Sequence, residues 1–143
     1  MMHQPMAEQI KNHAIAIISL IIAITALTYN TWREEATEKN RNIRLAAFEV
    51  LKNLGQLQVV VNAVHYGNEN NKVDPMLGWG HIALINDLSQ LLPPPIPETT
   101  QKLTDTWSKT WSSIKTDDDS TKLLSNEIDD SRDAILKVLA HLR

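Results

Sequence analysis

The sequence predicts an all-α protein in which a single N-terminal transmembrane helix is followed by an antiparallel four-helix bundle. Three observations lead to this fold class. Residues 14–32 are almost wholly apolar, the later apolar residues recur every three or four positions, and no segment alternates convincingly between apolar and polar residues. We therefore expect four parts: a short N-terminal tail (1–13), a transmembrane anchor (14–32), a polar juxtamembrane helix (33–42) and a helical-bundle domain (43–143).

The anchor segment has the length and composition of a membrane-spanning helix. Between Ala14 and Leu27 it holds six isoleucines and two leucines, and its only polar residues there are Ser19 and Thr25. Residues 14–32 would span about 28 Å at ~1.5 Å per residue, close to the ~30 Å hydrocarbon thickness of a bilayer. Amphipathic rings and cations prefer the headgroup layer. We expect three interface anchors at the end of the segment: Tyr29, Trp32 and Arg33.

Two other interpretations of the apolar segment are a cleaved signal peptide and the buried helix of a soluble domain. A signal peptide is disfavoured because the preceding residues carry a single lysine, Lys11, and because Ala14-Ile15-Ala16 lies at the start of the apolar run instead of after it. Five cations follow the anchor closely, which favours a cytoplasmic C-terminal domain by the positive-inside rule. Long domains can cross a membrane regardless of charge, so the opposite topology stays open.

Small and polar residues recur on one face of the anchor with alternating spacings of three and four: Ala16, Ser19, Ala23, Ala26 and Asn30. Small residues let two helix backbones approach within a membrane, and Ser and Asn can donate hydrogen bonds between helices. Chance also produces such a stripe in an alanine-rich segment. We expect the anchor to associate through this face, so the expected partners are the lipid bilayer and a membrane protein or a second copy of the chain.

Residues 33–42 are polar and contain no Gly or Pro, so they should continue the anchor as a solvated helix. Apolar residues with 4-3 spacing then predict a helix that packs against others in a bundle. Phe48 and Leu51 are expected to widen this bundle-facing stripe, and Gly67 lies where the helix should end. The stripe, called the inner seam below, consists of Ile43, Ala47, Val50, Leu54, Leu57, Val61 and Val64.

Asp74-Pro75 predicts the N-terminus of a second helix over about 76–92. This helix should place Leu84, Leu88 and Leu91 on one face, with Ile82, Ile85 and Leu92 beside them. The proline-rich segment 93–97 cannot continue a helix and should form a stiff connector.

A third helix is expected over about 98–115 and a fourth over about 120–142, capped by Asp119 or Ser120. The buried residues expected in the third helix are Leu103, Trp107, Trp111 and Ile114. Those expected in the fourth are Leu124, Ile128, Ser131, Ile135, Val138 and Leu142.

Composition argues against several classes of function. The net charge is −3, with no basic excess, so no nucleic-acid partner is expected. The absence of cysteine excludes disulfides and zinc–thiolate sites. The five histidines form no paired ligand motif, so neither a metal nor another cofactor is expected, although His65 and His81 could meet if their helices pack together. No motif of nucleophilic catalysis is present.

Three tryptophans stand out in a chain with a single phenylalanine: Trp79, Trp107 and Trp111. Trp107 and Trp111 are four residues apart and share a helix face. Gly78 and Gly80 are expected to permit a close backbone approach beside Trp79. The tryptophans are either core residues or the lining of a possible pocket for a ligand or a partner.

These patterns favour a non-enzymatic, single-pass membrane protein whose helical bundle acts as an interaction or scaffold module, or as a small accessory subunit of a membrane complex. The alternative is a membrane-anchored sensor bundle that binds a small ligand near the three tryptophans. An enzyme remains a third interpretation, because catalytic sites assembled from separate helices leave little trace in a sequence.

Overall fold

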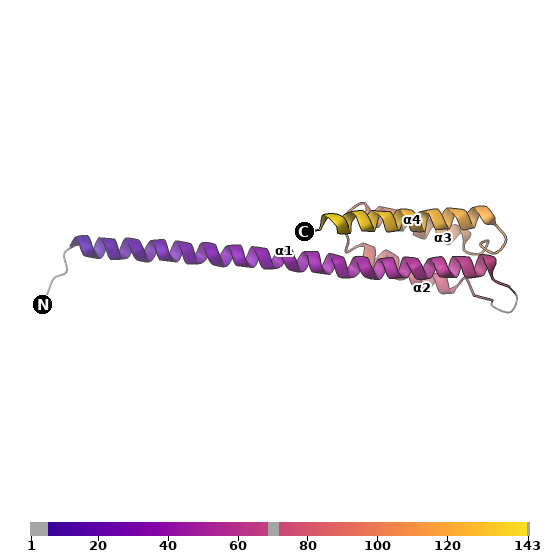
Figure 1. The fold of residues 1–143 in the computed structure, drawn as a ribbon, viewed down its shortest axis with the longest axis horizontal. Coiled ribbons are helices and arrows are strands. Elements are labelled where there is room, and N and C mark those ends of the chain that lie inside the picture. The colour runs from indigo at the N-terminus through magenta and orange to yellow at the C-terminus, as the bar shows by residue number, and fades with distance from the viewer. Residues whose placement is uncertain (1–5, 69–71, 143) are drawn as a thin grey trace. The chain divides into compact units, whose positions relative to one another are not determined.

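The computed structural model describes residues 6–68 and 72–142. These residues form four α-helices and no strand, which confirms the all-α class: α1 (Met6–Tyr66), α2 (Leu77–Ser89), α3 (Ile96–Thr110) and α4 (Asp118–His141) (Figure 1). Residues 6–13 of the expected tail belong to α1, and the rest of the tail lies outside the described residues. The chain divides into two units, Met1–Lys39 and Asn40–Arg143, which are described separately.

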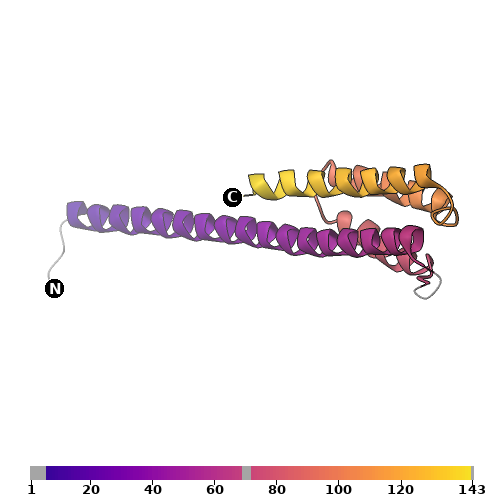
Figure 2. The same cartoon turned by 45° about the vertical axis from the view of Figure 1, so that its right-hand side comes forward.

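The second unit is a helical bundle in which α4 runs antiparallel to the second half of α1 (Figures 1 and 2). Gln58 of α1 donates to Ser125 of α4 at 3.1 Å, and Arg44, earlier in α1, donates to the carbonyl of Leu142 beyond the end of α4 at 2.9 Å. The same reversed order relates α2 to α3 and α3 to α4. The predicted helical bundle is therefore confirmed.

The inner seam of α1 faces the core as expected. All of its members are buried except Ile43, which is partly buried and packs against the core. Leu51 also packs against the core, but the prediction for Phe48 is wrong, because its side chain is 57% exposed. Phe48 and Val50 are two residues apart, or about 200° around a helix with 3.6 residues per turn, so they point to nearly opposite sides.

The buried face of α2 differs from the expected one. Ile82 and Ile85 are buried in α2 and Leu92 just beyond it, whereas Leu84 and Leu91 are exposed and Leu88 is only partly buried. The small residues of α2 explain this rotation: Gly78 and Ser89 lie on its buried side and let α3 approach closely. Close packing of α3 against these small residues thus outweighs the larger apolar area of the row formed by Leu84, Leu88 and Leu91.

Most helix boundaries agree with the prediction to within a few residues, but α3 ends at Thr110, five residues before the expected end, so Trp111 and Ile114 lie in the turns beyond it. Asp74 caps the turn that precedes α2, since its Oδ1 accepts a hydrogen bond from the Met76 amide at 2.9 Å. The proline-rich connector is shorter than expected, because α3 begins at Ile96 and has Pro97 in its first turn, where a missing amide proton costs nothing. Ile96 is fully buried and joins the core.

The first unit contains an apolar helical window that is long and apolar enough to cross a membrane, near the N-terminus, and none of that window is buried. The interpretation as a core helix of a soluble domain is therefore disfavoured. Hydroxyl groups in this part of α1 bond back to the preceding turn, and Thr25 donates to the Ile21 carbonyl at 2.8 Å. Thr28 and Thr31 make the same contact with the carbonyls of Ile24 and Leu27. The hydroxyl donors of these threonines therefore have partners within the helix and need no water.

Candidate functional site

The three tryptophans meet at one end of the bundle. Trp79 on α2 lies edge-on to Trp107 on α3, with ring centroids 6.4 Å apart and an interplanar angle of 86°. Its centroid is also 6.4 Å from that of Trp111, at 69°. Edge-to-face packing of this kind adds a modest attraction to the burial of the rings. The structure thus brings together the three residues that the sequence singled out.

Trp107 is a core residue: its side chain is fully buried, and its Nε1 has no hydrogen-bond partner among the described residues. A Cβ atom built on Gly78 would lie 2.1 Å from the Cζ2 atom of Trp107. The expected close approach therefore occurs at Gly78, with Trp107 as the neighbour, whereas Gly80 has nothing within 4 Å of such an atom. Trp79 and Trp111 are only partly buried.

A cavity of about 410 Å³ adjoins Trp111. Its lining combines the end of α1 with the segment before α2 and with the residues that follow α3, and its charged side chains are Lys72, Lys115 and Asp74. Trp79 and Trp107 do not line it. Of the three tryptophans, Trp111 is therefore the one placed to contact a small molecule, and two cations against one carboxylate in the lining would favour an anionic group.

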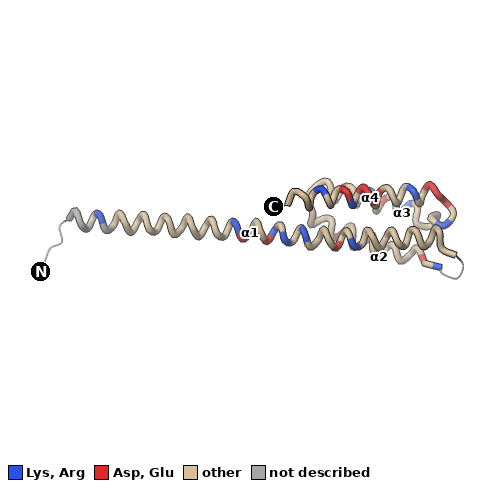
Figure 3. The backbone as a smooth tube through the Cα atoms, in the orientation of Figure 1, with Lys and Arg blue, Asp and Glu red and all other residues tan. Residues whose placement is uncertain are grey.

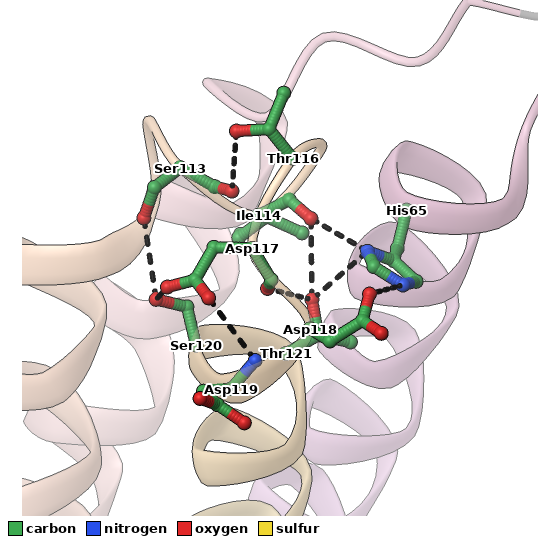
Figure 4. Close-up of polar contacts among 9 residues, drawn as sticks. All are labelled: His65, Ser113, Ile114, Thr116, Asp117, Asp118, Asp119, Ser120 and Thr121. Carbon is green, nitrogen blue, oxygen red and sulfur yellow. Dashed lines mark hydrogen bonds and ion pairs between the residues drawn. The ribbon is translucent and has the colours of Figure 1, made fainter.

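A polar cluster joins the C-terminal end of α1 to the start of α4 (Figure 4). His65 Nδ1 lies 2.7 Å from the carbonyl oxygen of Ile114, so this nitrogen donates, and Nε2 lies 3.2 Å from a carboxylate oxygen of Asp118. Thr121 contributes a hydroxyl 3.2 Å from Nδ1.

The α4 N-terminus is capped by Asp117, not by Asp119 or Ser120 as predicted. Asp117 accepts a hydrogen bond from the Asp119 amide at 3.1 Å and another from the Ser120 hydroxyl (Figure 4). The Ser120 hydrogen bond, together with the amide contacts, lowers the pKa of Asp117 below its ordinary value. The aspartate run is thus explained by helix capping and by the positive end of the helix dipole.

Asp117→Ala is expected to lower the melting temperature of the bundle at neutral pH, because α4 loses its cap. The folded-state pKa is depressed, so this stabilisation is present above the ordinary value of 3.8 and is lost as the pH falls through the lower folded value. The measurement is thermal unfolding followed by circular dichroism at pH 7 and at successively lower pH. Asp117→Asn is the matched control, since asparagine still caps a helix but does not titrate; unchanged melting of Asp117→Ala at neutral pH would contradict the capping role.

An ion pair crosses from α3 to α4. Lys102 Nζ lies 2.9 Å from Glu127 Oε1, and the glutamate side chain is almost fully buried whereas the lysine is exposed. The hydrogen bond and the charge of Glu127 raise the pKa of Lys102, so the stabilising charge is present at neutral pH and is lost only in strong alkali. Lys102 thereby compensates a buried carboxylate that would otherwise be costly.

The described residues contain no group of three or more His, Asp or Glu side chains that could hold a metal ion. His65 and His81 do not meet, because His81 Nδ1 lies 3.0 Å from the Asn53 side chain and His65 faces the start of α4. His3 lies outside the described residues.

The candidate membrane residues all lie on the exposed surface of α1. The five members of the small-residue face are exposed: Ala16, Ser19, Ala23, Ala26 and Asn30. The interface anchors Tyr29, Trp32 and Arg33 are exposed as well, and the rings of Tyr29 and Trp32 lie 6.4 Å apart. None of the described residues covers these side chains, so in that part of the chain they are accessible to a lipid or to a partner helix.

Sequence reasoning missed the polar cluster around His65. The residue lies in the last turn of α1, where a basic side chain is favoured, but its partners Ile114 and Asp118 lie about 50 residues further along the chain. No local pattern connects positions so far apart. No family model matches this chain, and neither a curated protein nor a solved structure matches it.

Proposed function

We propose that this protein is a non-enzymatic, single-pass membrane protein whose helical bundle acts as an interaction or scaffold module, or as a small accessory subunit of a membrane complex. The observation that carries the proposal is the presence, in one chain, of an apolar helical window that none of the described residues buries and of a bundle with a hydrophobic core. A bilayer would cover the apolar window. Its eight Ile and Leu residues contribute about −2 to −5 kcal/mol toward insertion.

Details of the first unit support the same role. The threonine hydroxyls bond to backbone carbonyls within α1, which lowers the cost of placing them in hydrocarbon. Tyr29 and Trp32 would lie at the headgroup layer, and Arg33 would follow in water. The cations after the anchor would keep the bundle in the cytoplasm by the positive-inside rule.

The exposed small-residue face would be the contact between this anchor and another membrane helix. Ala16, Ser19, Ala23 and Ala26 would allow a close backbone approach, and Asn30 could donate a hydrogen bond to the neighbouring helix. A bundle held at the membrane surface by such an anchor would position a partner relative to the bilayer.

Purification of the tagged full-length protein in mild detergent tests this proposal. We expect at least one membrane protein to co-purify in a reproducible, stoichiometric amount, as measured by mass spectrometry. Ala23→Phe should reduce the amount of this companion, because a large side chain blocks close helix approach. Ile21→Phe, on the opposite face of the helix, is the matched control. Purification of the chain without a companion would contradict the accessory-subunit role.

A second candidate is a membrane-anchored sensor, and the cavity beside Trp111 favours it. The cavity has the size of a small-molecule site and carries cations, so an anionic ligand is the chemistry to test. Small anionic metabolites added to the same purified protein should change its tryptophan fluorescence, and Trp111→Phe should reduce that change. A response that persists unchanged in Trp111→Phe would reject this cavity as the binding site.

A further inference from the structure

The cavity of about 410 Å³ beside Trp111, called the Trp111 cavity below, has walls that are mostly apolar. They come from three parts of the bundle: Val64 near the end of α1, Val73 and Pro75 before α2, and Trp111 just after α3. Apolar walls with a small number of polar groups are typical of small-molecule sites, in which the walls supply affinity and the polar groups fix the orientation of the ligand. The polar groups of this cavity therefore indicate which ligand it would take.

Lys115 provides a positive charge that the bundle does not use. Its side chain lines the cavity and is exposed, and within the described residues it makes no hydrogen bond or ion pair. An ammonium group carries three donors and attracts a carboxylate. Lys72 lines the same cavity and adds to the positive potential. A ligand in this cavity would thus be held by a carboxylate group beside Lys115.

Asp74 places a negative charge in the same lining. Its Oδ1 accepts a hydrogen bond from the Met76 amide at 2.9 Å, and its Oδ2 has no hydrogen-bond partner in the part of the chain that the structure describes. Figure 3 shows acidic and basic residues both in the segment that precedes α2 and in the one that precedes α4. An open carboxylate oxygen can accept from an ammonium group, whereas it repels a second anion.

The presence of both signs of charge in one lining restricts the class of ligand. A nucleotide or another polyanion would bring several negative charges towards Asp74. An acid without an amine would make no use of Asp74, and an amine without an acid would make no use of Lys115. At about 410 Å³ the cavity is also near the lower end of the range of roughly 300–1,000 Å³ that is usual for ligand pockets. These features fit a small molecule with one carboxylate, one ammonium group and an apolar body.

We propose that the Trp111 cavity binds an α-amino acid with an apolar side chain. The carboxylate of the amino acid would pair with Lys115 and its ammonium group with Asp74. Its side chain would pack against the apolar walls, which include the ring of Trp111. The proposal rests on the sensor function considered above and narrows its ligand from an anion to a zwitterion. Because the walls come from different helices and connectors, a bound amino acid would tie these segments of the bundle together.

Equilibrium dialysis of radiolabelled leucine against the full-length protein in mild detergent tests the proposal. We expect saturable binding that unlabelled leucine displaces. Three analogues each lack one feature of leucine: glycine lacks the apolar side chain, 4-methylpentanoate lacks the ammonium group and 3-methylbutylamine lacks the carboxylate. Each analogue should need a concentration at least roughly tenfold higher than leucine for the same displacement, because it loses either the burial of apolar surface or a charge-assisted hydrogen bond.

Two variants that each remove one charge assign the binding to this cavity. Lys115→Gln should lower the affinity for leucine about tenfold and abolish the advantage of leucine over 3-methylbutylamine, which has no carboxylate to lose. Asp74→Asn should abolish the advantage of leucine over 4-methylpentanoate, and asparagine keeps an acceptor for the Met76 amide. The matched controls are Lys109→Gln and Asp87→Asn, at exposed positions that do not line the cavity, and they should leave the affinity for leucine unchanged.

The outcomes separate this proposal from the sensor function on which it rests. No saturable binding of leucine, or equal displacement by leucine and 4-methylpentanoate, would overturn the zwitterion. In either case, a fluorescence response to small anions that requires Trp111 would keep the sensor with a simple anion as its ligand, whereas the absence of that response would remove the sensor as well. Leucine binding that neither Lys115→Gln nor Asp74→Asn weakens would overturn the assignment to this cavity.

Discussion

Replacing Gly78 with alanine should lower the free energy of unfolding of the bundle by about 3 kcal/mol, at the upper end of the cost of overpacking a core. The new Cβ atom would lie 2.1 Å from the Trp107 ring, which is fully buried and has Trp79 packed against it. The ring cannot move aside without displacing its neighbours, so α2 must shift. Urea unfolding of the full-length protein in detergent, followed by circular dichroism, measures the loss.

Two further variants identify the cause of this effect. Gly80→Ala has open space around its Cβ atom and should be neutral or stabilise by up to ~1 kcal/mol. Trp107→Ala alone should cost about 3–5 kcal/mol as a large-to-small core substitution. In the Trp107→Ala background, Gly78→Ala should cost almost nothing because the obstructing ring is gone. Additive losses in the double variant would contradict the contact as the cause.

Replacing both Ile21 and Ile22 with lysine should release the protein from the membrane. Each lysine near the centre of a spanning helix costs about 2.5–3.5 kcal/mol, and the two together exceed the apolar contribution of the segment. The wild-type protein is expected in the membrane pellet after alkaline extraction, and the double variant in the supernatant. The mass of the intact protein recovered from the membrane fraction should correspond to a chain that keeps residues 1–32.

The control for this experiment is a pair of lysines placed outside the apolar window. Ala36→Lys and Thr37→Lys add the same charge to a part of α1 that is already polar, so membrane extraction should not change. Recovery of a mature chain that begins after Trp32 would identify a cleaved signal peptide and contradict the anchor. Release of the wild-type protein by alkali would contradict it as well.

The sequence by itself determined the helical class, the approximate bounds of the four helices and most of the core. The inner seam of α1 could be predicted because the spacing of Ala47, Val50 and Leu54 is a local property, and one helical face is enough to identify it. The same is true of Leu124, Ile128 and Ile135 in α4. The apolar window near the N-terminus could also be found from composition and length alone.

Only the tertiary structure decided which face of α2 is buried, which aspartate caps α4 and what the tryptophans and His65 contact. In α2 the row of Leu84, Leu88 and Leu91 and the row that contains Ile82 and Ile85 are similarly apolar. Which of the two rows is buried depends on how closely Gly78 lets α3 approach. Asp117 and Asp119 are chemically identical, so the cap is chosen by where the turn after α3 ends. His65 meets Ile114 because α1 and α4 pack side by side. Periodicity encodes a helix and its apolar face, whereas contacts between helices depend on shape complementarity across the whole core, which no local pattern contains.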